Sequence, residues 1–335
     1  MDSSKNISSL SKIPDETRPK TDGVSLQERG ILGALVYADI FDYPLTEEEI
    51  YSYSVACPVS CEEVRLSLQQ SSWLAGRLEK RDPFWFLTGR SHLVERRRQR
   101  EGIARCLWTR AQRYVVRIAS LPFVRMLAVT GSMAMKNVSS LADDIDVLIV
   151  AENRRVFLTR SLAALISRLA RRSGVSLCPN FVVAKSNLRL SDESLFTAHE
   201  LAQLIPVSGR AMYLRLWDSN RWMESYLPNA APRLHALLDG RGSLLLHRRM
   251  IEAILRGEAG HVLDRWEKRR KLARLGTRLR ESAGAGIRFS ADVFKAHFVD
   301  HQDEALRQYA ARLLELGISD PDKFYPVPLI RHDGM

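Results

Sequence analysis

The spacing of apolar and polar residues divides the first third of the chain into short helices and a hairpin. Three short helices are predicted to open at Ser25, Thr46 and Ser60, and Ser25-Leu-Gln-Glu offers a capping box before its apolar stripe. Two short strand patterns then flank a turn within residues 78–87. Three helices and a hairpin are the layout of a winged helix, so we predict a winged-helix-like unit over residues 25–90.

The third helix of this unit would meet DNA if it acted as winged helices commonly do. It carries the apolar residues Val64, Leu66 and Leu68, and Arg65 as its single cation beside two glutamates. A helix that enters a phosphate-lined groove usually brings several cations. We therefore predict a packing or partner-binding role for this unit rather than DNA binding.

A connecting, arginine-rich helix is predicted over residues 91–119. Apolar positions that include Leu107, Val115 and Ile118 recur along it and are expected to pack on the following core. Long arginine side chains commonly form a solvated face, and we favour that interpretation over a nucleic-acid groove. The arginines concerned are Arg96, Arg97, Arg98, Arg100, Arg105, Arg110, Arg113 and Arg117.

Strand and helix patterns alternate in the middle of the chain, and helical patterns dominate after it. Strands are predicted at 124–130, 145–151 and 176–184, a short helix or turn at 132–138, and a helix at 154–172. Further helices are predicted at 196–204, 211–226, 243–280 and 291–316. The fold class is thus α+β, with a small mixed-sheet core over 120–230 and a C-terminal helical domain over 231–335.

Composition adds four expectations. Residues 1–24 are rich in Ser, Lys, Asp and Pro without an apolar centre, so we predict a disordered tail rather than a signal peptide. No apolar run approaches the roughly 18 residues of a membrane span, so no membrane partner is expected. The formal charge of +11 favours anionic partners such as nucleotides or nucleic acids. The four cysteines form no Cys-x-x-Cys pair, which favours reduced thiols in a cytoplasmic protein.

Two carboxylates at the start of the second central strand are the strongest candidates for chemistry. Asp144 and Asp146 flank Ile145, and the period of two in a strand sends both carboxylates to one face. Like charges this close repel unless a cation lies between them. Mg²⁺ prefers one or two carboxylates together with phosphate oxygens, so the pair predicts a site for Mg²⁺ or Mn²⁺. Asp143 is out of phase and is expected to belong to the turn.

The acid pair has a fixed relation to the end of the first central strand. That strand ends at Gly131-Ser132, and Asp144-Ile145-Asp146 follows after eleven intervening residues. The order, spacing and strand context resemble the signature of the polymerase-β-like nucleotidyltransferase superfamily. Three further segments resemble a group of bacterial nucleotidyltransferase-domain proteins. They are Leu177-Cys-Pro-Asn-Phe, Thr197-Ala-His-Glu-Leu and Trp222-Met-Glu-Ser-Tyr-Leu-Pro-Asn.

This resemblance implies an enzyme that transfers a nucleotidyl group from a nucleoside triphosphate, expected to be ATP, to a hydroxyl or phosphate acceptor with release of pyrophosphate. Gly131 and Ser132 would hold the triphosphate, helped by a helix N-terminus after the glycine. Lys136 either reaches a phosphate or is an ordinary exposed helix lysine. Asp144 and Asp146 would bind the metal ions and act as the catalytic residues. The acceptor stays open, because a small molecule, a protein and RNA all fit.

Active members of that superfamily usually bring a third carboxylate from a later strand, and the strand predicted at 176–184 has none. Its in-phase residues are Ser176, Cys178, Asn180 and Val182. Asn180 offers a neutral oxygen to a cation or a hydrogen bond to a nucleotide, or else caps a turn. Glu200 offers an acid from the helix predicted at 196–204, or else fixes that helix through a salt bridge.

Two other functions stay open beside the enzyme. The missing strand carboxylate suits a catalytically impaired module that binds a nucleotide or acts as a scaffold. The first unit and the arginine-rich helix suit a nucleic-acid-binding regulator. The remaining candidates are expected to be structural: His199, His297 and His301 as packing or surface residues, and Trp217, Trp222 and Tyr226 as a core or interface stripe.

Overall fold

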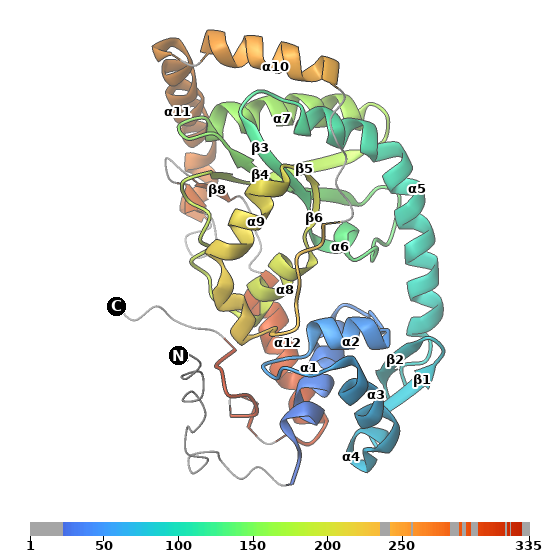
Figure 1. Cartoon of the computed structure of the whole chain (residues 1–335). Coiled ribbons are helices and arrows are strands. Elements are labelled where there is room, and N and C mark those ends of the chain that lie inside the picture. Colours follow the sequence, from blue (N-terminus) through green and yellow to red (C-terminus); the bar gives the residue numbers. More distant parts are fainter. Residues whose placement is uncertain are drawn as a thin grey trace, which may run out of the picture.

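The computed structural model shows a mixed α and β protein in which one sheet lies above an N-terminal helical unit in the view of Figure 1. The structure describes residues 23–234, 242–255, 257–281, 288–289, 293–295, 301–318, 320–321 and 323–329. The tail predicted over residues 1–24 lies outside this part of the chain except for its last two positions. His297 also lies outside it, as does the side chain of His301.

The N-terminal unit contains the predicted helices and hairpin in the predicted order. The capping box predicted at Ser25 forms, with Glu28 N donating to Ser25 Oγ at 3.2 Å, and capping boxes also form at Thr46 and Ser60. Val64 and Leu68 are buried, whereas Leu66 is 39% exposed, because a residue two positions from each of them points to the opposite side of a helix. The elements are α1 (Leu26–Ile40), α2 (Glu47–Tyr53), α3 (Cys61–Gln70), α4 (Ser72–Ala75), β1 (Leu78–Arg81) and β2 (Phe84–Leu87).

Helix α5 (Leu93–Ala119) runs from the hairpin to the sheet along one side of the molecule (Figure 1). Its residues Leu107, Val115 and Ile118 are buried, as predicted. Arg97 departs from the predicted solvated face, because it is 5% exposed and its Nη1 lies 2.7 Å from Glu49 Oε2 on α2. Within the described part of the chain, no helix is long and apolar enough to cross a bilayer.

The sheet contains the three predicted central strands and three further short ones. Its strand order is β6-β3-β4-β5-β8-β7, in which β4 and β5 are parallel and the other described pairs are antiparallel. The strands are β3 (Val124–Val129), β4 (Asp144–Ala151), β5 (Ser176–Ala184), β6 (Ile205–Ser208), β7 (Arg288–Phe289) and β8 (Val293–Lys295). The start of β4 therefore lies beside the start of β5. Strand β4 lies between β3 and β5 in the interior of the sheet.

A bulge in β5 corrects the predicted phase of that strand. Asp146 pairs with Cys178, but two residues later Leu148 pairs with Phe181, so β5 carries one extra residue. The extra residue reverses the alternation beyond it. Val182, which was predicted in phase with Cys178, consequently packs in the cluster on the opposite face from Asp146. Val183 packs on the face that was predicted for Val182.

The predicted C-terminal helices differ from the structure in three places. The range 211–226 is α9 (Arg210–Ser219) followed by the 3-10 helix η2 (Arg221–Ser225), because Asn220 Nδ2 donates to Leu216 O and ends α9. The range 243–280 is α10 (Gly242–Leu255) and α11 (Glu258–Glu281). The range 291–316 begins with β8, which pairs with β5, before α12 (His301–Glu315). The predicted helical domain thus also supplies strands to the sheet.

Helices cover both faces of the sheet. Helices α5 and α7 (Val156–Arg171) pack on the face that carries Leu127 and Ile149. Helix α8 (Leu195–Gln203) and α9 belong to the cluster on the other face, with Met126 and Leu148. This second cluster continues through α1 and α12, so the unit predicted at 25–90 shares its core with the sheet. As predicted, the cluster contains Trp217, Trp222 and Tyr226.

Candidate functional site

The turn after β3 requires a glycine. Gly131 has a φ of 65°, in the left-handed region that favours glycine, and begins the one-turn helix α6 (Gly131–Ala134). A Cβ atom at this position would lie 3.3 Å from Asp146 Oδ2. Glycine therefore leaves open space directly beside that carboxylate. Because α6 has only four residues, the helix dipole predicted at this turn contributes little.

Asp144 and Asp146 lie at the start of β4. Asp144 is exposed and Asp146 is partly buried, whereas Ile145 between them is fully buried in the cluster under α7. Both carboxylates therefore belong to the sheet face away from α7. Burial, the charge of Glu200 and the charge of Asp144 together raise the pKa of Asp146 from 3.8 to about 7. A nearby cation would stabilise the ionised form of this carboxyl group.

Hydrogen bonds of Thr130, the residue before Gly131, link Glu200 on α8 to Asp146. Thr130 Oγ1 donates a hydrogen bond to Glu200 Oε2 at 2.8 Å, and Thr130 N donates to Asp146 O at 3.1 Å. The charge of Glu200 is also a cause of the raised pKa of Asp146. The structure thus brings together Asp144, Asp146 and Glu200. The part played by Thr130 was not predicted, since nothing local in the sequence distinguishes it.

These three carboxylates form an open cluster. Over the described ranges, no group of three or more His, Cys, Asp or Glu side chains is already arranged to hold a metal ion. A closed structural zinc site would need four such ligands. Mg²⁺ commonly keeps several waters or phosphate oxygens beside one or two carboxylates. The carboxylate oxygens of Asp144 and Asp146 are donors of the kind that Mg²⁺ prefers.

Of the other predicted nucleotide-binding residues, Ser132 and Lys136 follow Gly131 and Asn180 lies on β5. Ser132 and Lys136 are exposed after Gly131, and Lys136 adopts a φ of 55°. Asn180 belongs to the bulged part of β5 beside the pair Asp146–Cys178, and its side chain lies outside the described residues. Their roles toward a nucleotide stay predictions.

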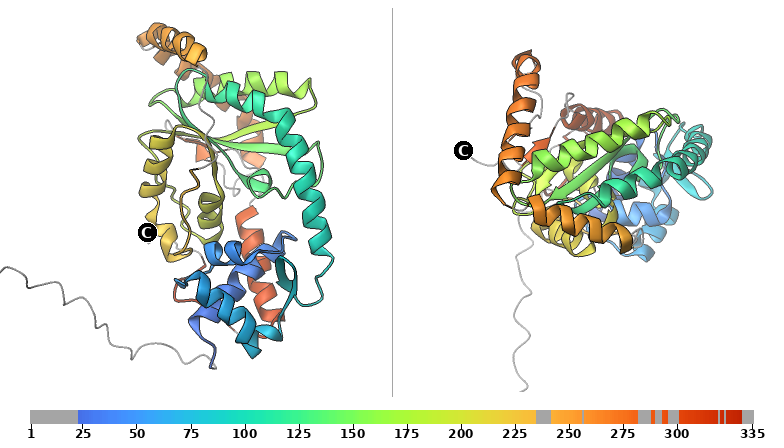
Figure 2. Two further views of the ribbon diagram at one scale, coloured as in Figure 1. Left: turned by 45° about the vertical axis from the view of Figure 1, so that its right-hand side comes forward. Right: turned by 90° about the horizontal axis from the view of Figure 1, so that it is seen from above.

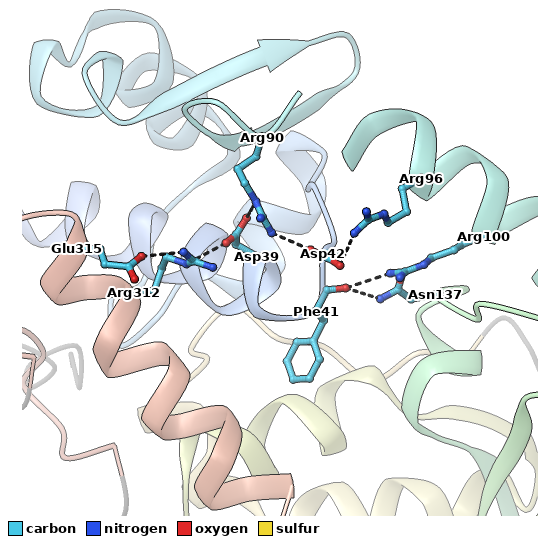
Figure 3. A network of polar contacts seen from close by, with 9 residues as sticks. All are labelled: Asp39, Phe41, Asp42, Arg90, Arg96, Arg100, Asn137, Arg312 and Glu315. Atoms are coloured by element: carbon cyan, nitrogen blue, oxygen red, sulfur yellow. Dashed lines mark hydrogen bonds and ion pairs between the residues drawn. The ribbon is translucent and has the colours of Figure 1, made fainter. Parts of the chain in front are cut away.

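A polar network holds the glycine turn against the N-terminal unit (Figure 3). Asn137 N donates to Ser132 O at 2.8 Å, which closes the turn. The Asn137 side chain accepts from Arg100 Nη1 at 3.0 Å and donates to Phe41 O at 2.9 Å. Arg100 therefore departs from the solvated face predicted for α5. Arg100 and Phe41 lie 37 and 96 positions from Asn137 in the sequence, and no local pattern links them to it. This network was therefore not predicted.

His199 and Asp143 have the structural roles that were predicted. His199 is 2% exposed and stacks on Tyr37, with ring centroids 3.6 Å apart. Burial lowers the pKa of His199 to about 3, so the ring is neutral at physiological pH. Asp143 accepts hydrogen bonds from Ser139 N at 2.6 Å and Ser140 Oγ at 2.9 Å, closing the turn before β4. We assign neither residue to the acid cluster.

A cavity of about 330 Å³ lies at the opposite end of β4 from the acid pair, near Glu152. Its charged side chains are already satisfied by the protein. Arg125 pairs with Glu152 and Glu252 at 2.8 and 2.9 Å, and Arg155 Nη2 donates to Leu255 O at 2.8 Å. We assign this cavity no ligand.

No protein-family model, curated protein or solved structure matches this chain. The resemblance to nucleotidyltransferases therefore rests on the residues themselves. The functional interpretation rests on the geometry of the glycine turn and the three carboxylates.

Proposed function

We propose that this protein is a Mg²⁺- or Mn²⁺-dependent nucleotidyltransferase that uses a nucleoside triphosphate, ATP in the first instance, and an acceptor hydroxyl or phosphate. The observation that carries the proposal is the convergence of Asp144, Asp146 and Glu200 beside the turn at Gly131. Phosphoryl transfer depends mainly on positioning and on neutralising charge. An acid cluster beside an open glycine turn suits both tasks.

The donor set fits a hard divalent cation. Asp144 and Asp146 would hold it, because carboxylate oxygens are preferred ligands of Mg²⁺. The raised pKa of Asp146 reflects negative charge that a cation would compensate. When bound, the cation supplies charge neutralisation for the triphosphate and activation of the acceptor hydroxyl.

The chain's own groups would orient the triphosphate. The missing Cβ of Gly131 lets the backbone approach phosphate oxygens, and the exposed Ser132 hydroxyl would donate to one of them. Thr130 holds Glu200 next to the pair through its 2.8 Å hydrogen bond. Because Asp146 ionises near pH 7, metal affinity is expected to rise with pH through this range.

The test removes the charge of the pair and keeps its shape. In the double variant Asp144→Asn plus Asp146→Asn, we expect the Kd for ATP with Mg²⁺ to rise about 10- to 100-fold and pyrophosphate release to be lost. Calorimetry measures the Kd, and a coupled assay measures pyrophosphate. Asp218→Asn is the matched control, because Asp218 is exposed on α9 beside Arg221. Unchanged ATP affinity in the double variant would refute the site.

A module that binds a nucleotide without turnover is the second candidate. Its motivation is that β5 has no acid between Ser176 and Ala184, so the third carboxylate comes from a helix and is hydrogen-bonded to Thr130. ATP binding that depends on Asp146, without pyrophosphate release on small-molecule, protein or RNA acceptors, would favour this module over the enzyme.

A further inference from the structure

Helices α5, α7, α10 and α11 lie on one side of the sheet, as the view from above in Figure 2 shows. The two stretches that supply α7 and most of α5, residues 102–142 and 153–191, contain no Asp or Glu. Protein surfaces normally intersperse both signs of charge. The exposed arginines here are Arg105, Arg110, Arg113 and Arg117 on α5, and Arg168, Arg171 and Arg172 at the end of α7.

Helix α7 exposes large apolar side chains within this basic surface. Leu165 and Leu169 are 51% and 43% exposed, and the exposed Arg168 and Arg172 follow each of them by three positions. These four residues have the spacing i, i+3, i+4, i+7, so they form one stripe. The opposite side of the helix is buried against the sheet.

Helix α11 packs beside α7 and repeats the same pattern. Val262 and Trp266 are both 54% exposed, and Arg265 and Arg269 are the exposed cations that follow them. The order is again apolar, arginine, apolar, arginine at i, i+3, i+4, i+7. Two neighbouring helices therefore present equivalent stripes.

Buried acidic residues of α10 and α11 contact the rest of the protein, although the buried side of a surface helix is usually apolar. Glu252 accepts from Phe123 N at 2.8 Å, and Asp264 accepts from Leu158 N at 2.8 Å at the start of α7. Three large apolar residues in the described second half of α10 are exposed, at 65%, 41% and 75%. These residues are Met250, Ile251 and Ile254. Polar contacts hold both helices, and the apolar residues named here for α10 and α11 are exposed.

We propose that this basic–apolar face, made of the exposed residues of α5, α7, α10 and α11 named above, docks against an anionic lipid membrane surface. Exposed Leu, Ile, Met and Trp side chains would enter the boundary between headgroups and acyl chains, while the arginines contact anionic headgroups. The sequence-based expectation of no membrane partner rested on the lack of a spanning segment, which peripheral docking does not need. The proposal is independent of nucleotidyl transfer.

Two other partners fit this face less well. RNA would use the arginines but gains little from aliphatic side chains such as Leu165 or Ile254, since nucleic-acid surfaces are bound by cations and stacking rings. A second copy of the chain would bring arginines against arginines, which repel. A lipid surface uses both kinds of side chain at once.

The experiment measures co-sedimentation of the full chain with vesicles of phosphatidylglycerol and phosphatidylcholine, compared with phosphatidylcholine alone. We expect binding to the anionic vesicles only. Arg168→Gln plus Arg172→Gln should reduce the partition coefficient roughly 30-fold, the typical effect of two arginines at an anionic surface. Leu165→Ser plus Leu169→Ser should reduce it roughly 10-fold at unchanged charge.

Arg215→Gln plus Arg221→Gln is the matched control, because it removes the same charge from exposed positions on α9 and η2, on the other side of the sheet. Circular dichroism and thermal melting check that each variant folds. The proposal fails if anionic vesicles do not bind the chain, or if the control lowers binding as much as the α7 arginine pair. It also fails if the leucine pair has no effect, and RNA binding lost with the arginine pair alone would then assign the face to nucleic acid.

Discussion

At the scale of single residues, Asp146 is the position where the fold disfavours the ionised form of a carboxyl group. Its carboxyl group lies partly buried beside two other acids, and this environment raises its pKa to about 7. An unfolded aspartate ionises near pH 4. Between pH 4 and 7 the folded protein therefore binds a proton that the unfolded chain has released, so rising pH removes stability in this window.

Asp146→Asn should remove this penalty. At pH 8 without metal, we expect the variant to be more stable than the wild type by roughly 2–4 kcal/mol, since one pKa unit corresponds to about 1.4 kcal/mol. At pH 4 the two proteins should have equal stability. Urea unfolding at both pH values measures the difference, and Mg²⁺ should stabilise only the wild type. A gain that is the same at pH 4 and pH 8 would contradict the assigned pKa.

The sequence predicted the acid pair because its signal is local. Two residues separated by Ile145 share a face in any strand, so Asp144 and Asp146 follow from alternation alone. Glu200 could be offered only as one of two alternatives, because its distance from Asp146 depends on how α8 packs. Thr130 gave no signal, since its hydrogen bond to Glu200 exists only in the folded chain.

At the scale of elements, helix α5 does more than connect two units. Through Arg100 and Asn137 it fixes the segment after Gly131 to the end of α1 (Figure 3). The position of the glycine turn thus depends on an arginine supplied by α5. We expect the turn to loosen when this contact is lost.

Arg100→Ala should lower the free energy of unfolding by about 1–2 kcal/mol, because it removes a charged donor from the part-buried Asn137 Oδ1 and from the exposed Phe41 O. It should also weaken ATP binding severalfold through the looser turn. Arg105→Ala on the same helix is the matched control, since Arg105 is exposed. Thermal unfolding and calorimetry report the two effects. Equal behaviour of both variants would show that Arg100 does not position the turn.

Predicted elements agree with the structure where local pattern sets them. Strand β5 begins and ends where alternation placed it, and β3 and β4 differ by a residue. Strands β7 and β8 were missed because segments of two or three residues become strands only by pairing, here with β5. The bulge in β5 was missed for the same reason, because it is defined by the partner strand.

At the scale of the whole molecule, one hydrophobic cluster joins the N-terminal unit, one face of the sheet and the C-terminal residues. Gly33 on α1 packs closely against two tyrosines of this cluster. A Cβ atom there would lie 2.3 Å from Tyr325 Oη and 2.9 Å from Tyr309 Oη, and these two hydroxyls form a buried 2.6 Å hydrogen bond. An ion pair of Asp39 with Arg312 Nε at 3.1 Å joins the same elements.

Gly33→Ala should therefore destabilise the whole chain by about 1–3 kcal/mol, the usual range for overpacking. Because the core is shared, we expect circular dichroism and tryptophan fluorescence to report one common unfolding transition at lower temperature. Gly102→Ala on α5 is the control, since its Cβ would meet no atom within 4 Å, and it should stabilise by up to about 1 kcal/mol. An early, separate transition of the N-terminal unit would contradict the shared core.

Because C-terminal residues pack on α1, helix α1 can complete its contacts only near the end of protein synthesis. Arg29 Nη1 donates to Phe324 O, 295 positions further along the chain. At roughly 5–20 residues per second, a ribosome needs about 15–60 s to make that partner after α1 emerges. Throughout this interval the apolar side of α1 faces the cell without its final cover. A nascent chain of this protein is thus expected to be a client of ribosome-associated chaperones until translation ends.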